Sequence, residues 1–333
     1  MDWFERVPKV EIHLHLEGAI PYGSLWELVR KYGGNPATPD ALALARLFEY
    51  RDFEHFVEIW DWKNGFLREY DDFTLIAEAA ARDWARQNIR YVEAFFSPPD
   101  FARHGLKAQK IAEAIRAGLS RVKQVDVALV ADLVRDSGPE KAFLTLSEIH
   151  EVRSFGVIGI GIGGSEHKFP PELFEAVFER ARELGFRTSA HAGETAGAAS
   201  VWGAISALRV DRVGHGTRAE EDPSLLDFLA ERRIPLEMCP LSNVRTGVVP
   251  SIARHPIRRY FERGLVVTVN SDDPKMFGNS LAQEYRCLEA ELGFSRDEIR
   301  TLILQGIHAA WLPEEDKSRL TESFQLDPDW NME

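Results

Sequence analysis

The first predicted strand is the stretch Val10-Glu11-Ile12-His13-Leu14-His15-Leu16. Successive side chains of a strand point to opposite faces, so His13 and His15 share one face. Two imidazoles on one face can reach a single metal ion. An isolated His-X-His is more often a solvated pair on an edge strand. The pair therefore indicates a metal site only if further ligands follow downstream.

Seven further runs rich in β-branched residues follow this stretch. The eight predicted strands cover residues 10–16, 89–96, 125–134, 157–164, 187–194, 212–217, 234–243 and 265–274. Segments with helical spacing lie between them, among them 72–87, 108–122, 171–184, 223–232 and 257–262. Strands that alternate with helices form parallel βαβ units, and eight such units predict an α/β fold, a (β/α)8 TIM barrel. An open doubly wound sheet is the structural alternative.

The segment 21–71 is too long for one strand-to-helix connection. It carries the aromatic residues Phe53, Phe56, Trp60, Trp62 and Phe66. We expect a helical insertion after the first strand that is able to cover the mouth of the barrel. The alternative is that these aromatic residues only pack a core.

The composition bounds the class of protein. The 333 residues include 44% hydrophobic residues, enough for one large domain over residues 1–333. The net charge of −13 argues against nucleic acid or an anionic membrane as the main partner. Only Cys239 and Cys287 occur, and no basic start precedes an apolar stretch. We therefore expect a cytoplasmic protein of undetermined oligomeric state, with a small-molecule partner.

Polar clusters fall at the carboxyl ends of predicted strands, where the active sites of TIM barrels are built. The clusters are Ser189-Ala190-His191-Ala192-Gly193-Glu194, Gly214-His215-Gly216-Thr217 and Asn270-Ser271-Asp272-Asp273-Pro274. Each alone has an ordinary explanation as a turn or a hydrogen-bonded strand end. Together with the first strand they bring several histidines and a carboxylate to one mouth, which predicts a catalytic Zn²⁺ site.

These residues resemble the adenosine deaminase group of the amidohydrolase superfamily. The matching stretches are Pro8-Lys9-Val10-Glu11-Ile12-His13-Leu14-His15-Leu16-Glu17-Gly18, His191-Ala192-Gly193-Glu194, His215-Gly216, Cys239-Pro240-Leu241-Ser242-Asn243 and Ser271-Asp272-Asp273-Pro274. They span most of the chain in the order of that family.

The resemblance implies a metal site and a reaction. His13, His15, His191 and Asp272 are the implied ligands of one Zn²⁺ per chain. The fourth strand ends in Gly163-Gly164 without a lysine, which favours one metal over two. The implied reaction is hydrolytic deamination at C6 of a 6-aminopurine, with the 6-oxopurine and ammonia as products.

The resemblance also implies roles for other residues. Glu194 would protonate ring N1, His215 would orient the attacking water, and Asp272 would share the proton transfer. Asp273 would hold N7 and the backbone N–H of Gly164 would meet N3. His15 and Glu17 are expected to complete the substrate contacts.

Departures from the family pattern bear on the substrate. Adenosine deaminases usually have Asp at the position of Glu17 and Arg at the position of Phe95. Glu17 and Phe95-Phe96 look like the adenine deaminase branch, whereas Gly164-Ser165-Glu166 does not. A third branch acts on adenosine analogues modified on the 5′ side, such as aminodeoxyfutalosine. We rank a 6-aminopurine nucleoside first and free adenine second.

Two interpretations from other classes compete with this one. Gly159, Gly161 and Gly164 fit the G-x-G-x-x-G pattern of a dinucleotide-binding oxidoreductase. That pattern leaves the histidines unexplained. A metal-binding module without catalysis would explain the ligands but leave Glu194, His215 and Asp273 without a role.

Overall fold

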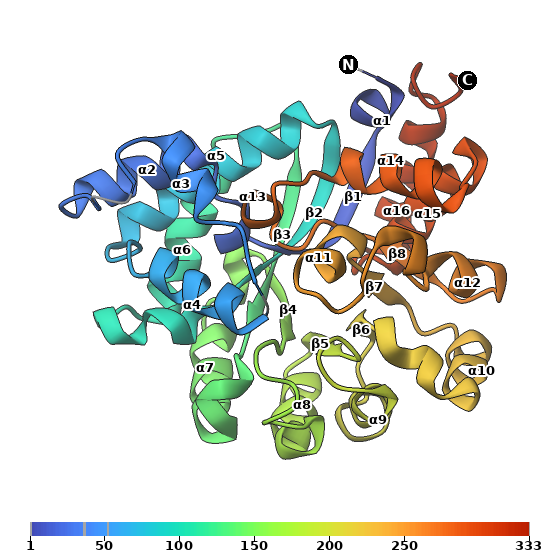
Figure 1. Ribbon diagram of the computed structural model, residues 1–333. Helices are drawn as coiled ribbons and strands as arrows, with labels where there is room; N and C mark the ends of the chain where they lie inside the picture. The colour runs from blue at the N-terminus through green and yellow to red at the C-terminus, as the bar shows by residue number, and fades with distance from the viewer. Residues whose placement is uncertain (1, 36–37, 52, 333) are drawn as a thin grey trace.

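The computed structural model describes residues 2–35, 38–51 and 53–332. Eight parallel strands follow one another around the sheet in sequence order, and helices surround them (Figure 1). The strands are β1 Lys9–His15, β2 Ile89–Phe96, β3 Asp126–Asp132, β4 Val157–Gly161, β5 Arg187–Ala192, β6 Arg212–His215, β7 Leu236–Met238 and β8 Val267–Val269. The predicted (β/α)8 barrel is confirmed, and the open doubly wound sheet is wrong.

The helices of the barrel follow their strands along the chain. They are α5 Tyr70–Arg86, α6 Ala108–Leu119, α7 Gly138–His150, α8 Glu175–Glu183, α9 Ala198–Gly203, α10 Pro223–Arg232, α12 Ile257–Glu262 and α15 Arg296–Ala309. Outside the segment that follows β1, the other α-helices of the described residues are α1 Trp3–Arg6, α11 Pro240–Arg245, α13 Pro274–Phe277, α14 Leu281–Leu292 and α16 Glu314–Gln325. In Figure 1, α11 lies in front of the ring of strands.

The barrel closes between its last and first strands through the segment that follows β8. Leu14 and Asp272 form a parallel bridge, and the amide of His15 donates to the Asp272 carbonyl at 2.9 Å. The side chain of Asn270 accepts hydrogen bonds from the amides of Ile12 and His13. Closure therefore brings Asp272 beside the two histidines of β1.

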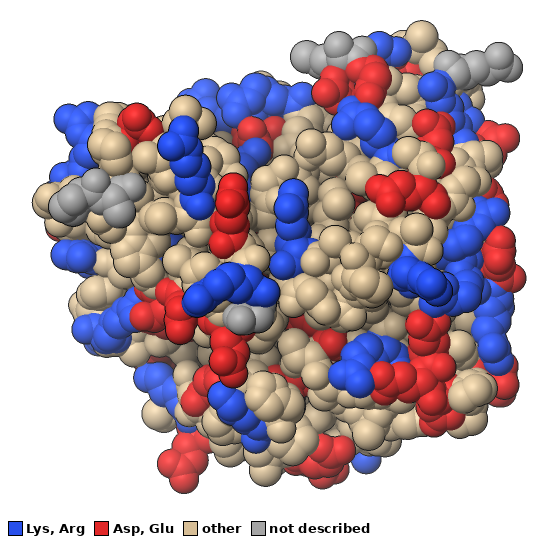
Figure 2. All heavy atoms as spheres, viewed as in Figure 1, with Lys and Arg blue, Asp and Glu red and all other residues tan. Residues whose placement is uncertain are grey.

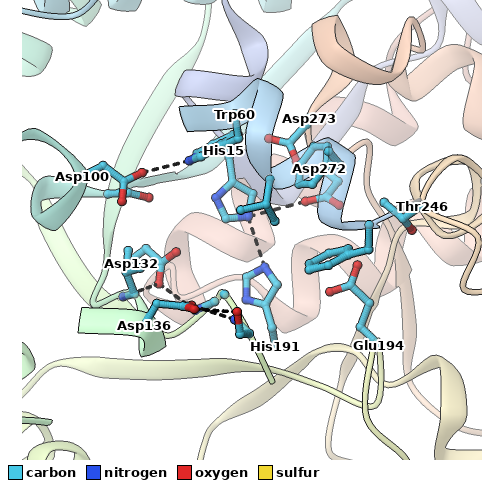
Figure 3. Close-up of a pocket in the computed structure, with 18 of the residues that line it drawn as sticks. His15, Trp60, Asp100, Asp132, Asp136, His191, Glu194, Thr246, Asp272 and Asp273 are labelled. Carbon is cyan, nitrogen blue, oxygen red and sulfur yellow. Dashed lines mark hydrogen bonds and ion pairs between the residues drawn. The ribbon is translucent and has the colours of Figure 1, made fainter. Parts of the chain in front are cut away.

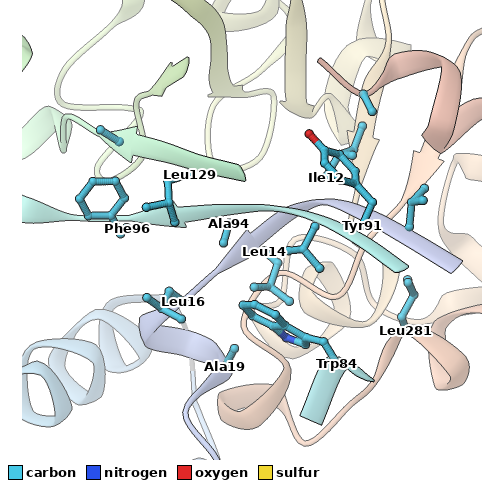
Figure 4. Packing of buried hydrophobic residues seen from close by; sticks show 14 of the residues in the cluster. Ile12, Leu14, Leu16, Ala19, Trp84, Tyr91, Ala94, Phe96, Leu129 and Leu281 are labelled. Atoms are coloured by element: carbon cyan, nitrogen blue, oxygen red, sulfur yellow. The ribbon is translucent and has the colours of Figure 1, made fainter. Parts of the chain in front are cut away.

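Alternation along β1 separates the core from the site. Leu14 and Leu16 pack outward, and Figure 4 shows Leu14 near Trp84 of α5 and Leu281 of α14. Leu14, Leu16, Trp84 and Leu281 are all buried. The β1 residues that alternate with Leu14, among them His13 and His15, point into the barrel, since successive side chains of a strand point to opposite faces. The outward side chains pack β1 against the surrounding helices, and its inward side chains are available for the site.

The segment after β1 is helical, as predicted. A short 3₁₀ turn η1 at Glu17–Ala19 leads to α2 Tyr22–Lys31, α3 Ala41–Arg46 and α4 Phe53–Asn64. Lys63 of α4 is buried and donates to the Glu17 carbonyl at 2.7 Å. This contact ties the insertion to the end of β1.

Six strands, β3 to β8, are shorter than the sequence predicts, and β7 and β8 differ most. The run 234–243 was expected to be extended, but β7 ends at Met238 and α11 begins at Pro240. Proline lacks an amide proton and suits the first turn of a helix, which ends the strand there. The predicted strand 265–274 likewise ends at Val269, and α13 begins at Pro274. The residues between carry polar side chains into the barrel mouth.

The surface carries charges of both signs. On the face seen in Figure 2, acidic and basic side chains are interspersed. The N-terminal helix lies beside the C-terminal segment (Figure 1), where Arg6 pairs with Asp329 at 2.8 Å. Within the described part of the chain, no helix is long and apolar enough to cross a membrane.

Candidate active site

Four groups from separate strands converge at the carboxyl end of the barrel. The ligand atoms of His13, His191, His215 and Asp272 lie within 4.8 Å of one another, and all four residues are buried. His15 Nε2 lies 3.2 Å from His191 Nε2 and 3.5 Å from Asp272 Oδ1. The structure therefore brings the four sequence-predicted ligands together, with the predicted catalytic residue His215 in the same cluster.

The chemistry of this cluster fits a divalent metal. His13 Nε2 is a buried nitrogen that has no hydrogen-bond partner among the described residues, and it lies 3.6 Å from Asp272 Oδ1. The other ring nitrogen, Nδ1, bonds Glu237 Oε2 at 2.7 Å. A carboxylate on the far nitrogen orients a histidine and makes it a better ligand. Imidazoles with one carboxylate form a donor set that suits Zn²⁺.

Glu237 of β7 is held in its charged form. Burial by itself favours the neutral acid, but Arg212 and the hydrogen bond with His13 lower the pKa of Glu237 to about 2. Arg212 also pairs with Glu93 at 2.6 Å. Ser189 donates to the same Glu237 oxygen as His13 does, at 2.9 Å. The charged Glu237 carboxylate, which also bonds Ser189 and Arg212, thus fixes the orientation of the His13 ring.

Burial keeps the other imidazoles neutral. It lowers the pKa of His15 to about 3 and that of His215 to about 4, and it lowers the pKa of His191 well below its ordinary value. Neutral imidazole is the form that binds metals.

Asp272 has one oxygen fixed and the other turned to the histidines. Ser242 of α11 donates to Oδ2 at 2.6 Å, while Oδ1 faces His13 and His15. The backbone of Asp272 has φ +63°, and that of His215 has φ +60°. Residues with side chains rarely adopt this region, and such backbone strain tends to occur at functional sites.

Glu194 is a buried carboxyl group in a loop that another carboxylate organises. Burial raises the pKa of Glu194 well above its ordinary value, and the nearby charge of Asp272 adds to this. Glu166 Oε2 accepts hydrogen bonds from the amides of Glu194, Thr195 and Ala196 at 2.8–3.1 Å. The loop that carries Glu194 is thereby fixed, and its side chain lies 3.7 Å from His215 Nε2.

A chain of hydrogen bonds sets the proton on His215. Asn243 Oδ1 accepts from Thr217 Oγ1 at 2.8 Å and lies 3.1 Å from His255 Nε2. The amide nitrogen of Asn243 is then the donor toward His215 Nδ1, at 3.2 Å. Neutral imidazole carries one proton, which therefore lies on Nε2 of His215.

A cavity of about 320 Å³ opens from this cluster. Phe53, Phe56 and Trp60 of α4 line it on the side of the insertion. The ring of Trp60 stands edge-on to that of His15 at 5.9 Å between centroids. The aromatic residues of α4 thus form one wall of the pocket, whereas Trp62 packs against Phe66.

The predicted substrate contacts fall at different depths. Asp273 and Gly164 line the cavity, and Asp273 Oδ1 is buried with no partner among the described residues. Gly18 leaves room for the carboxylate of Asp273, because a Cβ at position 18 would clash with that carboxylate. Glu17 lies behind the lining, where its Oε1 accepts from the Ser97 amide at 3.0 Å. Ser97 is the neighbour of Glu17 that borders the cavity.

Several residues of the site were not predicted from the sequence. They are Glu93, Glu166, Arg212, Glu237, His255, Lys63, Asp100 and Asp132. A signal did exist for Glu237, because it is a charged residue inside the apolar run of β7. Asn243 lies in a stretch that carries the family resemblance, but its hydrogen bond with His215 was not predicted.

The glycine pattern in β4 has a packing explanation. A Cβ at Gly159 would meet the ring of Trp311, and one at Gly161 would meet the ring of Phe95. Both glycines therefore allow close packing of aromatic rings. The dinucleotide-binding interpretation is wrong, since neither glycine opens a phosphate-binding turn.

The chain resembles known proteins along nearly all of its length. The model of the adenosine deaminase family matches residues 8–326. An adenine deaminase of Bordetella parapertussis is 36% identical over 311 residues, which are 92% of this chain and 98% of the relative. An aminodeoxyfutalosine deaminase of Streptomyces avermitilis is 35% identical over 319 residues, which are 94% of this chain and 89% of the relative.

A solved structure gives the same result. A crystal structure of an amidohydrolase from Burkholderia ambifaria with bound Zn has a TM-score of 0.90 and 30% sequence identity, and the match covers 99% of this chain and 92% of that one. The bound Zn of that structure agrees with the metal-ligating character of the cluster described above. The chain therefore belongs to the adenosine deaminase family, and it is a hydrolase that acts on carbon–nitrogen bonds of cyclic amidines.

Proposed function

We propose that this enzyme removes the 6-amino group of a purine nucleoside by hydrolysis, giving the 6-oxopurine nucleoside and ammonia. The substrate in this proposal is adenosine or a 5′-modified analogue such as aminodeoxyfutalosine. The supporting observation is the cavity of about 320 Å³, which runs from the catalytic cluster to α4 and has room for more than a base. The aminodeoxyfutalosine deaminase relative supports the same class. Free adenine is the second candidate, supported by the adenine deaminase relative.

His13, His15, His191 and Asp272 hold one Zn²⁺ in this proposal. His13 Nε2 and His15 Nε2 both lie within 3.6 Å of the same Asp272 oxygen, whereas His215 Nε2 faces Glu194. Bound zinc supplies a water whose pKa is lowered to about 7. His215 is left to act on that water and on the substrate.

The side chains divide the proton transfers. Glu194 stays protonated because burial raises its pKa, so it donates a proton to N1 as C6 becomes tetrahedral. His215 presents its Nε2 proton to the oxygen that adds to C6 and stabilises the charge there. Asp272 accepts the proton that this oxygen loses. Asp272 returns this proton to the amine, the C6–N6 bond breaks and ammonia leaves. The remaining hydroxyl proton passes to the Glu194 carboxylate as the C6 carbonyl forms, which restores both groups.

Two groups orient the purine ring. Burial raises the pKa of Asp273 well above its ordinary value, and the nearby Asp272 adds to this. A protonated Asp273 donates to N7. The backbone N–H of Gly164 donates to N3 from the opposite wall, where φ of +102° suits a glycine. His15 contacts the remaining side of the substrate, and Glu17 supports that side from behind the lining through its hydrogen bond with the Ser97 amide.

We also propose that the insertion 21–71 acts as a lid. Its helix α4 contributes Phe53, Phe56 and Trp60 to the wall of the cavity, so movement of α4 would admit or enclose the substrate. The whole chain of 333 residues then functions as one barrel domain with a lid.

An ammonia-release screen tests the proposed function. The panel contains adenosine, 5′-modified adenosines and adenine, which release ammonia, and N6-methylated forms, which release methylamine and are followed by formation of the 6-oxopurine. Each is incubated with the zinc-loaded enzyme. We expect the highest kcat/KM with a nucleoside. Turnover of adenine alone would overturn the proposal in favour of the second candidate.

A further inference from the structure

The cavity wall away from the metal cluster is acidic. Asp61, Asp100, Asp132 and Asp136 line the cavity in addition to Glu194, Asp272 and Asp273. Among the described residues that line it, none is lysine or arginine. Figure 3 shows Asp100 and Asp132 across the cavity from Glu194 and Asp272. Asp61 pairs with Arg103, whereas no salt bridge among the described residues engages Asp100, Asp132 or Asp136.

Asp132 is the most deeply placed of these wall residues. It ends β3, and 4% of it is exposed. Its Oδ1 accepts from the amides of Gly163 at 2.8 Å and Val134 at 3.2 Å. No donor among the described residues reaches Oδ2. Two backbone amides thus fix this carboxyl group in place and leave one acceptor free at the cavity.

The neighbouring carboxylates are engaged with the protein. Asp100 Oδ2 accepts from Trp60 Nε1 at 2.9 Å and from Asn64 Nδ2 at 3.1 Å. Asp136 accepts from the amide and the hydroxyl of Ser165 at 2.8 and 2.5 Å. These bonds leave Asp132 as the fixed, buried acceptor, while the other two contribute negative charge beside it.

Resting on the proposed function, we propose that Asp132 is a specificity-determining residue that accepts a hydrogen bond from a ribose hydroxyl and excludes substrates carrying a phosphate on the sugar. Hydrogen bonds to a charged acceptor are the stronger kind, so a hydroxyl donor gains here. A phosphate oxygen has no proton to donate at neutral pH and brings further negative charge to an acidic, partly enclosed wall. The enzyme thus selects nucleosides without a sugar phosphate over nucleotides.

A comparison of substrates with and without the hydroxyl tests this assignment. The substrates are adenosine, its 2′-, 3′- and 5′-deoxy forms, and adenosine 5′-monophosphate, each with the native enzyme and with Asp132→Asn. In the native enzyme one deoxy form should lose about 10-fold in kcat/KM, as a lost hydrogen bond to a charged group implies. In D132N the same deoxy form should lose little kcat/KM relative to adenosine, since the amide at position 132 is already a weaker acceptor than the charged carboxylate.

The monophosphate gives the second readout. We expect the native enzyme to prefer adenosine to the monophosphate by at least about 100-fold, and D132N to narrow that preference by about 10-fold or more. Asp297→Asn is the matched control: it changes the net charge equally, but its side chain is 90% exposed and lies outside the cavity. The control should leave unchanged both the kcat/KM ratio of adenosine to its deoxy form and the ratio of adenosine to its monophosphate.

The outcomes separate the two proposals. Turnover of adenine with no turnover of any nucleoside overturns the proposed function and this assignment with it. Turnover of adenosine with equal turnover of the monophosphate, or with no deoxy form that responds to D132N, overturns only the assignment. Zinc content measured for D132N shows whether a lost activity comes from a damaged metal site instead. In that case Asp132→Ser replaces it, and the same ratios decide.

Discussion

At the level of single residues, His13 and Asp272 each have one polar atom fixed by the protein and another left for chemistry. His13 bonds Glu237 through Nδ1 and leaves Nε2 free. Asp272 bonds Ser242 through Oδ2 and leaves Oδ1 toward the histidines. This arrangement fixes ligands before a metal binds, so less ordering is needed on binding.

The carboxyl group of Glu194 gives the most specific prediction at this scale. Glu194→Gln should retain the metal and lose about 10²–10⁴-fold in kcat, because an amide cannot supply the proton. The reaction uses the protonated acid, and burial raises its pKa. Native turnover should therefore fall as the pH rises through that raised pKa. The exposed Glu183→Gln serves as the control, and full activity of E194Q would refute the role of the acid.

Alanine variants of the adjacent carboxylates Asp272 and Asp273 should differ in their zinc content. Asp272→Ala removes an oxygen that lies 3.5–3.6 Å from two histidine nitrogens, so we expect the variant to lose its zinc. Asp273→Ala should keep the zinc and bind substrate less well, because its role is toward N7. Elemental analysis of the purified variants measures this difference. Equal loss of zinc in both would contradict the division of roles.

The sequence predicts the reactive residues better than the residues that support them. His13, His191, His215 and Asp272 lie at strand ends in recognisable patterns, and they meet in the structure. Glu237 is a partner of His13 from a strand 224 residues away in the chain. Such pairs depend on the register and closure of the barrel, which periodicity along one strand does not specify.

At the level of elements, a buried lysine helps to hold α4 against the barrel. Lys63 Nζ donates to the Glu17 carbonyl and to Asn64 Oδ1, both at 2.7 Å. It also lies 4.2 Å from the centroid of the Trp60 ring. The same charge thus supports the aromatic wall and the turn after β1.

Replacement of this lysine should loosen the wall. Lys63→Met leaves the Glu17 carbonyl without its donor, at a cost of about 1–3 kcal/mol in the free energy of unfolding. We expect a lower Tm and a KM that rises more than kcat falls. The exposed Lys110→Met is the control. An unchanged Tm and KM in K63M would mean that α4 is positioned without it.

Strands were predicted with accurate bounds where the stretch with a strand-like hydrophobic pattern is long enough. The strands β1 and β2 agree with the expected ranges within a residue at each end, because they are seven and eight residues long. β7 and β8 are three residues each, and the extended segments expected after them bend at Cys239 and Asn270 toward the mouth. Short strands in a barrel are specified by their neighbours rather than by their own pattern.

At the level of the whole molecule, the closed barrel explains why residues 260 positions apart act together. Ser271 donates through its amide and hydroxyl to Glu11, and Asp272 pairs with the backbone of β1. The eightfold alternation of strand and helix in the sequence predicts this closure. The width of the cavity and the carboxylates on its far wall depend on packing between loops, which only the structure supplies.

In the proposed function, one bound divalent ion and this cluster deaminate a purine nucleoside. The most direct measurement follows conversion of adenosine to inosine together with zinc content, before and after chelation and again after zinc is restored. We predict about one zinc per chain, with turnover lost on chelation and recovered with the metal. Full turnover by the metal-free protein, or turnover of adenine with none of adenosine, would contradict the account.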